Sequence, residues 1–318
     1  MRLPVVNGAA LVVALGLAMW GTTVRMDSEP SRSTVVMAPP ALPGTTELTD
    51  ARGQVIAVRE YERIVSLNSV ADAILLELVP PGHLIAVTQY SLDTHPEGYR
   101  YGARPGVIQS TDIEQILALK PDLVVGSRFS GEPFMARLRE AGVPVFDPGD
   151  LRGVETTLHT IAVLGSLLGH PDRAARIAAD YRLRLAALEA AIPAADRAPG
   201  IWLTLYGDTI YGGTRGSSYG DMLHYGGVHD MAAAEGYTDW PQFSLEQLLA
   251  LDPPLVVTSV GMGETICSHS TLRELACCQP GGRVVEVPGQ YHTDAGLGIV
   301  HAARAVQQLV HPSSLASP

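Results

Sequence analysis

A fifteen-residue segment of this chain occurs twice, 132 residues apart. Residues 113–127 read IEQILALKPDLVVGS and residues 245–259 read LEQLLALDPPLVVTS, with ten of the fifteen positions identical. Each copy contains an apolar helical pattern, a proline that ends it, and a short apolar run typical of a buried strand. The duplication therefore predicts two related α/β lobes, with ligands bound in the cleft between them.

The segments around the first copy alternate between strand and helix patterns. A turn at Asp50 and Gly53 predicts a hairpin over residues 48–55. The strands that we expect next are 63–68, 84–90, 123–127 and 143–146, and the helices are 70–79, 113–119 and 133–141. This alternation is typical of a parallel α/β lobe.

The middle of the chain has a different pattern, because strand signals are nearly absent between residues 154 and 192. Segments 154–168 and 172–192 are apolar at helical spacing, and Pro171 and Pro193 flank the second one. We expect a long helix to join the two lobes. The alternation then resumes with strands at 201–206, 255–260 and 284–287 and a last helix over 295–310.

The N-terminal residues resemble an export signal, since Arg2 precedes a mostly apolar run over residues 3–20. The expected organisation is a signal peptide or N-terminal anchor (1–26), a disordered tether (27–46), an N-terminal lobe (47–152), a connecting helical segment (153–193) and a C-terminal lobe (194–318). We expect the protein in the periplasm, either released by cleavage of the signal peptide or held there by an uncleaved anchor. The formal net charge of −11, without any Lys/Arg run, argues against a nucleic-acid partner.

Together, several motifs resemble the periplasmic metal-chelate receptors of ABC importers, the helical-backbone class III that binds cobalamin, ferric siderophores or haem. The motifs are residues 49–53 (TDARG), 63–67 (RIVSL), Glu114 with 119–124 (LKPDLV), 225–227 (YGG) and 240–246 (WPQFSLE). The resemblance implies two Rossmann-like lobes joined by a long backbone helix, and a monomer without enzymatic activity or a cofactor of its own. Its ligand would be a metal chelate such as cobalamin or a ferric siderophore. Its partner would be an ABC permease dimer with a separate ATPase, because this chain has no P-loop motif.

The resemblance implies that Glu114 and Glu246 dock into arginine pockets of the two permease subunits. A carboxylate and a guanidinium form a strong, oriented pair. The alternative for Glu114 is a capping box over residues 111–114 (TDIE), in which Glu114 would bond back to the helix start. In the second copy, however, Gln247 takes the capping position after Ser244, which leaves Glu246 one residue earlier.

Aromatic side chains bury the faces of large flat chelates with little loss of entropy. The candidate ligand-binding aromatics are Tyr90, Phe129, Tyr206, Tyr211, Trp240 and Tyr291. The resemblance places Tyr90, Tyr206, Tyr211 and Trp240 at cleft positions of cobalamin receptors. Arg128 could pair with a ligand carboxylate or phosphate, or it could be a solvated surface residue.

Histidine and tyrosine side chains could alternatively bind haem iron. His292 beside Tyr291 is one candidate, and the loop with His95, Tyr99 and Tyr101 is another. A haem receptor of the same class is therefore the alternative function.

Two further hypotheses concern a hydrolase active site and the three cysteines. Residues 216–220 match the G-x-S-x-G motif of serine hydrolases around Ser218, with Asp252 and His292 following in hydrolase order. The approach to Ser218 over residues 212–216 reads as a loop, which favours a helix start capped by Ser217 or Ser218. Three cysteines, Cys267, Cys277 and Cys278, permit one disulfide from Cys267 to either of the others, or a zinc site with His269.

Overall fold

A computed structural model describes residues 35–39, 44–95, 97–108, 113–126, 130–292 and 296–312, except for the side chains of Gln290 and His292. The expected signal segment, 1–26, lies outside these residues. Within the described part, no helix combines the length and the apolar character needed to cross a bilayer.

The expectation of a disordered tether over 27–46 is wrong for residues 35–39. Ala38 is fully buried, and its N–H donates to the carbonyl of Pro148. Met37 forms an isolated antiparallel bridge with Gly149. Gly149 has a φ of +102°, and a Cβ at this position would lie 2.3 Å from the carbonyl oxygen of Val36. The short apolar sequence within the Ser/Pro/Thr-rich stretch therefore packs on the fold, because a glycine opposite lets the two backbones approach.

Lobe 1 is built on a five-stranded sheet with the order β5-β4-β3-β6-β7, in which every neighbouring pair is parallel. Its strands are β3 (Ile64–Ser66), β4 (Leu84–Thr88), β5 (Gly106–Val107), β6 (Leu123–Val125) and β7 (Val145–Phe146). Its helices are α2 (Ser69–Leu78), α3 (Gln89–Thr94), the short η1 (Gly98–Tyr101), α4 (Ile113–Ala118) and α5 (Glu132–Glu140). The expected hairpin is present as β1 (Glu47–Thr49) and β2 (Val55–Ala57), which pair antiparallel.

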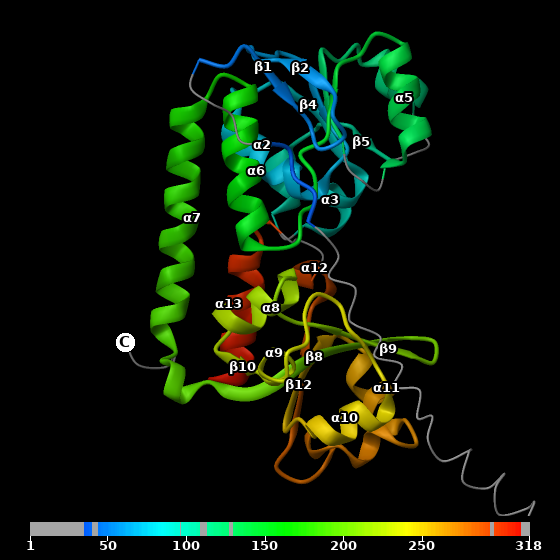
Figure 1. Ribbon diagram of the computed structural model, residues 1–318, viewed down its shortest axis with the longest axis vertical. Coiled ribbons are helices and arrows are strands. Elements are labelled where there is room, and N and C mark those ends of the chain that lie inside the picture. Colours follow the sequence, from blue (N-terminus) through cyan, green and yellow to red (C-terminus); the bar gives the residue numbers. More distant parts are fainter. Residues whose placement is uncertain are drawn as a thin grey trace, which may run out of the picture. The chain divides into compact units, whose positions relative to one another are not determined.

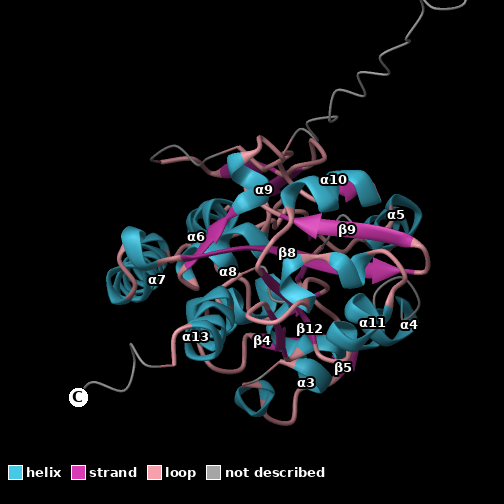
Figure 2. Ribbon diagram, turned by 90° about the horizontal axis from the view of Figure 1, so that it is seen from below, coloured by secondary structure: helices cyan, strands magenta, loops and turns pink. Residues whose placement is uncertain are grey.

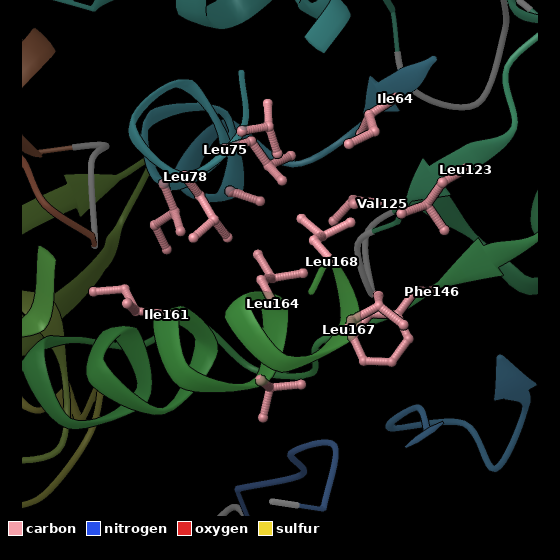
Figure 3. Close-up of a cluster of buried hydrophobic side chains, with 14 of the residues drawn as sticks. Ile64, Leu75, Leu78, Leu123, Val125, Phe146, Ile161, Leu164, Leu167 and Leu168 are labelled. Atoms are coloured by element: carbon pink, nitrogen blue, oxygen red, sulfur yellow. The ribbon is translucent and has the colours of Figure 1, made fainter. Parts of the chain in front are cut away.

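The core of lobe 1 covers both faces of this sheet. Alternate strand residues such as Val65, Val124 and Val145 pack against α4 and α5 on one face. On the other face, Ile64, Leu123, Val125 and Phe146 pack against α2 and against the helix that follows β7. Figure 3 shows these side chains pointing toward Leu75 and Leu78 of α2 and toward Ile161, Leu164, Leu167 and Leu168. Burial on both faces explains why the strands read as continuous apolar runs.

Lobe 2 is built on a six-stranded sheet with the order β11-β9-β8-β12-β13 and with β10 paired to β8. Its strands are β8 (Ala198–Tyr206), β9 (Thr209–Gly213), β10 (Val228–Asp230), β11 (Gln242–Phe243), β12 (Leu255–Ser259) and β13 (Arg283–Val287). Its helices are α8 (Ser218–Tyr225), α9 (Met231–Ala234), α10 (Leu245–Leu251), α11 (Met262–Ser268), η4 (Leu272–Glu274), η5 (Ala276–Cys278), α12 (Gly289–His292) and α13 (Ile299–Val310). Strand β9 pairs antiparallel with β8 and β11, which the sequence patterns did not indicate.

Both faces of the second sheet are covered as well, and Figure 2 shows helices on either side of β8 and β9. Ile201, Leu203 and Val256 pack with the cluster that includes α10 and α11. Trp202, Leu255 and Val257 pack with α8 and α13 on the opposite face. The period of two along β8 and β12 thus separates the two halves of the lobe 2 core.

Two helices rather than one connect the lobes: α6 (Val154–Leu167) and α7 (Pro171–Ala191). Helix α6 belongs to the lobe 1 core. Helix α7 runs beside both lobes in Figure 1: Ala174 and Ala178 pack in lobe 1, whereas Tyr181, Leu185 and Leu188 pack against α13 of lobe 2. The prediction of two α/β lobes with a long backbone helix is therefore confirmed, and α7 is that helix.

The duplicated segment has the same structure in both lobes. Its strands are β6 and β12, which lie in different sheets. Lys120 and Asp252 occupy the same position of the repeat, between helix and proline, and both have a left-handed backbone, with φ values of 49° and 40°. The equivalence of the two copies therefore extends to a backbone conformation that is unfavourable for residues other than glycine.

Candidate functional site

The repeated glutamates lie on the first turns of α4 and α10. Glu114 and Glu246 are both exposed. Ser244 and Gln247 form the capping box of α10, so Glu246 has no part in it. Hydrogen bonds from its own backbone N–H and from Ser244 lower the pKa of Glu246, which therefore stays ionised. Thr111 and Asp112, which would form the start of the alternative capping box with Glu114, lie outside the described residues.

Four tyrosines at the junction of the lobes form what we call the interlobe aromatic cluster: Tyr90, Tyr206, Tyr211 and Tyr219. Tyr90 comes from α3 of lobe 1, and the others come from β8, β9 and α8 of lobe 2. Tyr206 and Tyr211 are edge-to-face, with ring centroids 6.0 Å apart. Tyr90 and Tyr206 are 40% and 72% exposed, so both rings can be covered by a ligand. Burial, and then the nearby Tyr206 and Tyr90, raise the pKa of Tyr219 to about 12, so its hydroxyl keeps its proton.

The β8–β9 hairpin positions the lobe 2 members of this cluster. Tyr206 ends β8, and Tyr211 pairs with Thr204 across the ladder. The Tyr219 ring stacks on Trp202 at 4.5 Å, with an interplanar angle of 6°. A Cβ on Gly213 would lie 2.5 Å from the Tyr219 side chain, so only glycine permits this approach.

Trp240 lies in the loop that enters β11, whose Gln242 pairs with Tyr211. The Arg152 guanidinium lies 5.5 Å from the Trp240 ring centroid, within the range of a cation–π interaction. Arg152 also pairs with Asp150 at 3.1 Å and with Asp239 at 3.3 Å. Asp150 belongs to lobe 1 and Asp239 to lobe 2, so this buried arginine ties the Trp240 loop to the other lobe.

A buried carboxylate positions Tyr90. Asp72 of α2 is fully buried and accepts hydrogen bonds from the Thr88 N–H (3.0 Å), the Thr88 hydroxyl (2.6 Å) and the Ser91 hydroxyl (2.6 Å). Thr88 is the N-cap of α3, the helix that carries Tyr90. Burial raises the pKa of Asp72 to about 6, against the lowering effect of these hydrogen bonds.

Asp221 of α8 is a second carboxylate at the junction, and it is half-buried. It accepts the N–H of Val154, the first residue of α6, at 2.7 Å. A Cβ on the preceding Gly153 would lie 2.2 Å from the Asp221 carboxylate, so a larger residue there would displace this carboxylate from its contact with Val154. Burial raises the pKa of Asp221. The contact joins lobe 2 to the start of the connecting segment.

Of the remaining candidates for ligand contact, the structure describes only the side chain of Tyr291. Arg128 and Phe129 lie outside the described residues, as does the side chain of His292. Tyr291 is half-buried and packs against the core around Trp202.

The second set of possible haem ligands does not form one site. Tyr101 is buried in the lobe 1 core, whereas Tyr99 is 79% exposed. His95 is edge-to-face with Tyr101 at 6.0 Å, and its Nδ1 accepts the Glu97 N–H.

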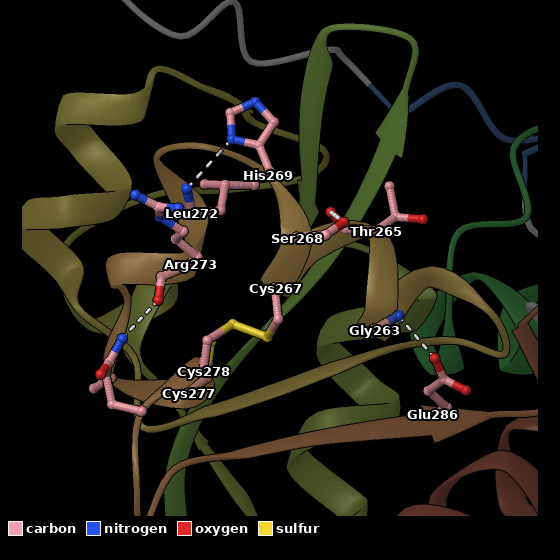
Figure 4. The surroundings of a disulfide bond; sticks show 12 residues. Gly263, Thr265, Cys267, Ser268, His269, Leu272, Arg273, Cys277, Cys278 and Glu286 are labelled. Carbon is pink, nitrogen blue, oxygen red and sulfur yellow. Dashed lines mark hydrogen bonds between the residues drawn. A yellow bond between two sulfur atoms is a disulfide. The ribbon is translucent and has the colours of Figure 1, made fainter.

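Cys267 and Cys278 form a disulfide, with a Cα–Cα distance of 5.5 Å, which decides between the two expected pairings (Figure 4). Cys277 is the buried thiol left over, and burial raises its pKa to about 11. The Nδ1 of His269 accepts the N–H groups of Thr271 and Leu272. Since the disulfide removes two thiolates, the zinc interpretation is wrong. In the described part of the chain, no three His, Cys, Asp or Glu side chains are grouped as metal ligands would be.

The hydrolase motif is the start of a helix. Ser217 is the N-cap of α8 and accepts the Gly220 N–H, as expected. The expectation of a loop over 212–216 is wrong for Gly212 and Gly213, which end β9. Ser218 is buried, and among the described residues no acid or base is hydrogen-bonded to it. Asp252, its proposed partner, instead accepts the Ala276 N–H.

Sequence reasoning missed Tyr219, Arg152 and Asp72. Tyr219 was visible only as part of the hydrolase motif, and the small residues Gly212 and Gly213 were a signal of close packing. Arg152 and Asp72 take their importance from partners distant in sequence, which a single sequence does not reveal.

Similarity to known proteins agrees with this architecture. The cobalamin-binding protein of Halobacterium salinarum (strain ATCC 29341 / DSM 671 / R1) is 30% identical over 215 residues, 67% of this chain and 58% of its own length. The chain thus spans less than two thirds of that relative. The vitamin B12-binding protein of Vibrio cholerae serotype O1 (strain ATCC 39541 / Classical Ogawa 395 / O395) is 29% identical over 62% of this chain and 70% of its own length.

Solved structures share the fold. The periplasmic haem-binding protein RhuT from Roseiflexus sp. RS-1 superposes with a TM-score of 0.63, at 23% identity, over 79% of this chain and 99% of RhuT. The lobes and α7 are thus those of a class III periplasmic binding protein. Residues 64–271 match the family described as periplasmic binding proteins, so the chain belongs to the periplasmic binding protein family.

Proposed function

We propose that this protein is an extracytoplasmic receptor that captures a metal chelate between its lobes and delivers it to an ABC importer, with cobalamin or another corrinoid as the favoured ligand. The observation that carries the proposal is the interlobe aromatic cluster, in which the partly exposed rings of Tyr90 from lobe 1 and Tyr206 from lobe 2 lie near Tyr219. Exposed aromatic rings from two lobes suit a large flat molecule. The cobalamin-binding and vitamin B12-binding relatives support the choice of a corrinoid. No catalytic step is part of this function.

Titration of the purified protein with cyanocobalamin, haemin and a ferric siderophore, followed by visible absorption, tests the ligand. We expect saturable binding of cyanocobalamin, weakened at least tenfold in Tyr90→Ala/Tyr206→Ala, which removes one exposed ring of the cluster from each lobe. Tyr99→Ala, which removes an exposed ring outside the cluster, should leave the affinity unchanged. A haemin complex with a shifted Soret band, without cyanocobalamin binding, would identify haem as the ligand instead. Binding of the ferric siderophore alone would exclude a corrinoid as the ligand.

We also propose that Glu114 and Glu246 dock on the two permease subunits. Each carboxylate is exposed at the same position of the repeated helix, and one is present in each lobe. Import of labelled ligand in native cells should be lost in Glu114→Ala/Glu246→Ala, while ligand affinity is retained. Glu140→Ala/Glu264→Ala removes one exposed glutamate from each lobe outside the repeat and should import normally. Equal import by the two double variants would contradict the docking role.

A further inference from the structure

A second cavity lies beside α7, away from the interlobe aromatic cluster. It has a volume of about 360 Å³ and is lined by α2, the segment from His95 to Tyr101, α7 and the start of α13. None of the four tyrosines of the cluster lines it. We call it the α7 cavity. Its walls come from lobe 1, the backbone helix and lobe 2.

The charges of the α7 cavity leave a positive excess. Four arginines and three carboxylates line it. Arg100 pairs with both Glu77 and Glu97, and Arg184 lies 3.9 Å from Asp180. Each of the three carboxylates therefore already has an arginine beside it.

Two arginines of the cavity are left over. Within the described part of the chain, Arg173 and Arg176 have no acidic partner. They lie three residues apart on α7 and hence on one face of that helix. Arg173 is half-buried and Arg176 is exposed, so both guanidinium groups can reach a ligand from solvent.

The start of α13 adds to this positive potential. Leu297 and Gly298 line the cavity, and Gly298 is the N-cap of a twelve-residue helix without a side-chain cap. The N-terminal end of a helix carries a partial positive charge that favours anions. This helix end lies on the lobe 2 side of the cavity, whereas Arg173 and Arg176 lie on the backbone helix.

We propose that the α7 cavity binds a small organic phosphate. Two neighbouring guanidinium forks and a helix N-terminus are complementary to phosphate oxygens, which accept hydrogen bonds in several directions. The volume lies within the range of small-molecule sites and exceeds what inorganic phosphate alone would fill. Because both lobes and α7 contribute walls, a bound phosphate stabilises their relative arrangement. The site is independent of the chelate-binding function.

Calorimetric titration with inorganic pyrophosphate at low ionic strength tests this proposal, because salt screens such contacts. We expect the wild type to bind and Arg173→Gln/Arg176→Gln to bind at least tenfold more weakly. Arg173→Lys/Arg176→Lys, which keeps the charges but not the forks, should be intermediate. The matched control is Arg182→Gln, an exposed arginine of α7 that does not line the cavity, and it should bind as the wild type does.

Citrate, titrated in parallel, separates phosphate recognition from attraction to any polyvalent anion. We expect citrate to bind at least tenfold more weakly than pyrophosphate. The proposal is overturned by equal affinities of wild type and glutamine variant, by the absence of pyrophosphate binding to the wild type at millimolar concentration, or by citrate binding as tight as that of pyrophosphate. Circular dichroism of each variant verifies that it is folded.

Discussion

The two lobes share a three-strand unit and differ on the other side of the sheet. In lobe 1, β3, β6 and β7 are neighbours, and in lobe 2 the same places are taken by β8, β12 and β13. In lobe 1, α2 leads directly from β3 to β4, which pairs parallel with β3. In lobe 2, α8 likewise leads to β10, which pairs parallel with β8, but β9 is inserted between β8 and α8.

This difference places the proposed ligand site. The inserted strand β9 and the extended end of β8 carry Tyr211 and Tyr206, and the described residues of lobe 1 form no counterpart of this hairpin. The shared unit instead carries Glu114 and Glu246, which the two lobes present alike. The duplicated part of the fold thus serves the symmetric permease, in the function proposed above, while the part that differs contacts an asymmetric ligand.

Equivalent core substitutions in the shared unit should lower the free energy of unfolding equally in the two lobes. Leu123 and Leu255 occupy the same repeat position and are 0% and 2% exposed. Leu123→Ala and Leu255→Ala should each lower the free energy of unfolding by about 3–4 kcal/mol, through lost burial and a cavity. Urea unfolding followed by circular dichroism measures both. Leu249→Ala, at a 43% exposed position of the same repeat, should change it by less than about 1 kcal/mol.

The same variants test whether α7 couples the lobes. With Trp20→Phe and Trp240→Phe, Trp202 in the lobe 2 core is the only tryptophan of the chain. In this background Leu123→Ala should shift the fluorescence transition as much as the circular dichroism transition, because α7 packs against both cores. A fluorescence transition that stays in place would show that lobe 2 unfolds independently.

The second comparison concerns two carboxylates, of which Asp72 is buried and Asp221 is half-buried. Asp72 and Asp221 are each the fourth residue of their helix, after the N-caps Asn68 and Ser217. Asp72 bonds within lobe 1, whereas Asp221 bonds to Val154 of the connecting segment. Burial raises both pKa values, that of Asp72 to about 6. The folded protein therefore holds these protons more tightly than the unfolded chain.

The sign of the pH effect follows from the raised pKa values. The contribution of Asp72 to stability is greatest below its ordinary pKa near 4 and is lost as the pH rises through about 6. Between pH 4 and pH 7, the unfolding free energy of the wild type should fall relative to that of Asp72→Asn by on the order of 2–3 kcal/mol. Asp221→Asn should show the same sign. Urea titrations at several pH values measure both, and parallel curves for wild type and Asp72→Asn would contradict the raised pKa.

Substitutions at the exposed end of the β8–β9 hairpin of lobe 2 should weaken ligand binding with little effect on stability. Tyr206→Ala/Tyr211→Ala should weaken cyanocobalamin binding about tenfold, equivalent to about 1.4 kcal/mol, because stacking area is lost. The melting temperature should change little, since Tyr206 is 72% exposed. A large loss of stability without loss of affinity would instead assign these rings to structure.

Most of the fold could be predicted because the repeat, the strand–helix alternation and the prolines around α7 are local signals. The antiparallel β9 could not, since its sequence TIYGG lacks clear alternation and its glycines are set by packing against Tyr219 and Phe243. The packing of residues 35–39 could not be predicted for a similar reason. Met37 pairs with Gly149, a glycine more than 100 residues away in the sequence.

The candidate site was predictable only in its aromatic part. Exposed tyrosines at strand ends are visible in the sequence, whereas the fixing of their loops by Asp72 and Arg152 depends on tertiary contacts. The disulfide was predictable in part. The sequence limited Cys267 to two partners, and the fold around η5 selects Cys278.

The smallest expected effect is a difference in stability change between the two copies of the repeat when their left-handed residues, Lys120 and Asp252, are replaced by glycine. Glycine adopts this conformation without the steric cost that Lys120 and Asp252 bear, although it adds entropy to the unfolded chain. Lys120→Gly should therefore raise the free energy of unfolding by about 0.5–1 kcal/mol. Asp252→Gly gains the same relief but loses the 2.7 Å hydrogen bond from the Ala276 N–H, worth about 1 kcal/mol, and should be nearly neutral. Asp252→Asn keeps a side-chain acceptor and serves as the control in the same urea titrations. If the two glycine variants gain equally, the Asp252 side chain contributes nothing, and the two copies are energetically alike as well as structurally.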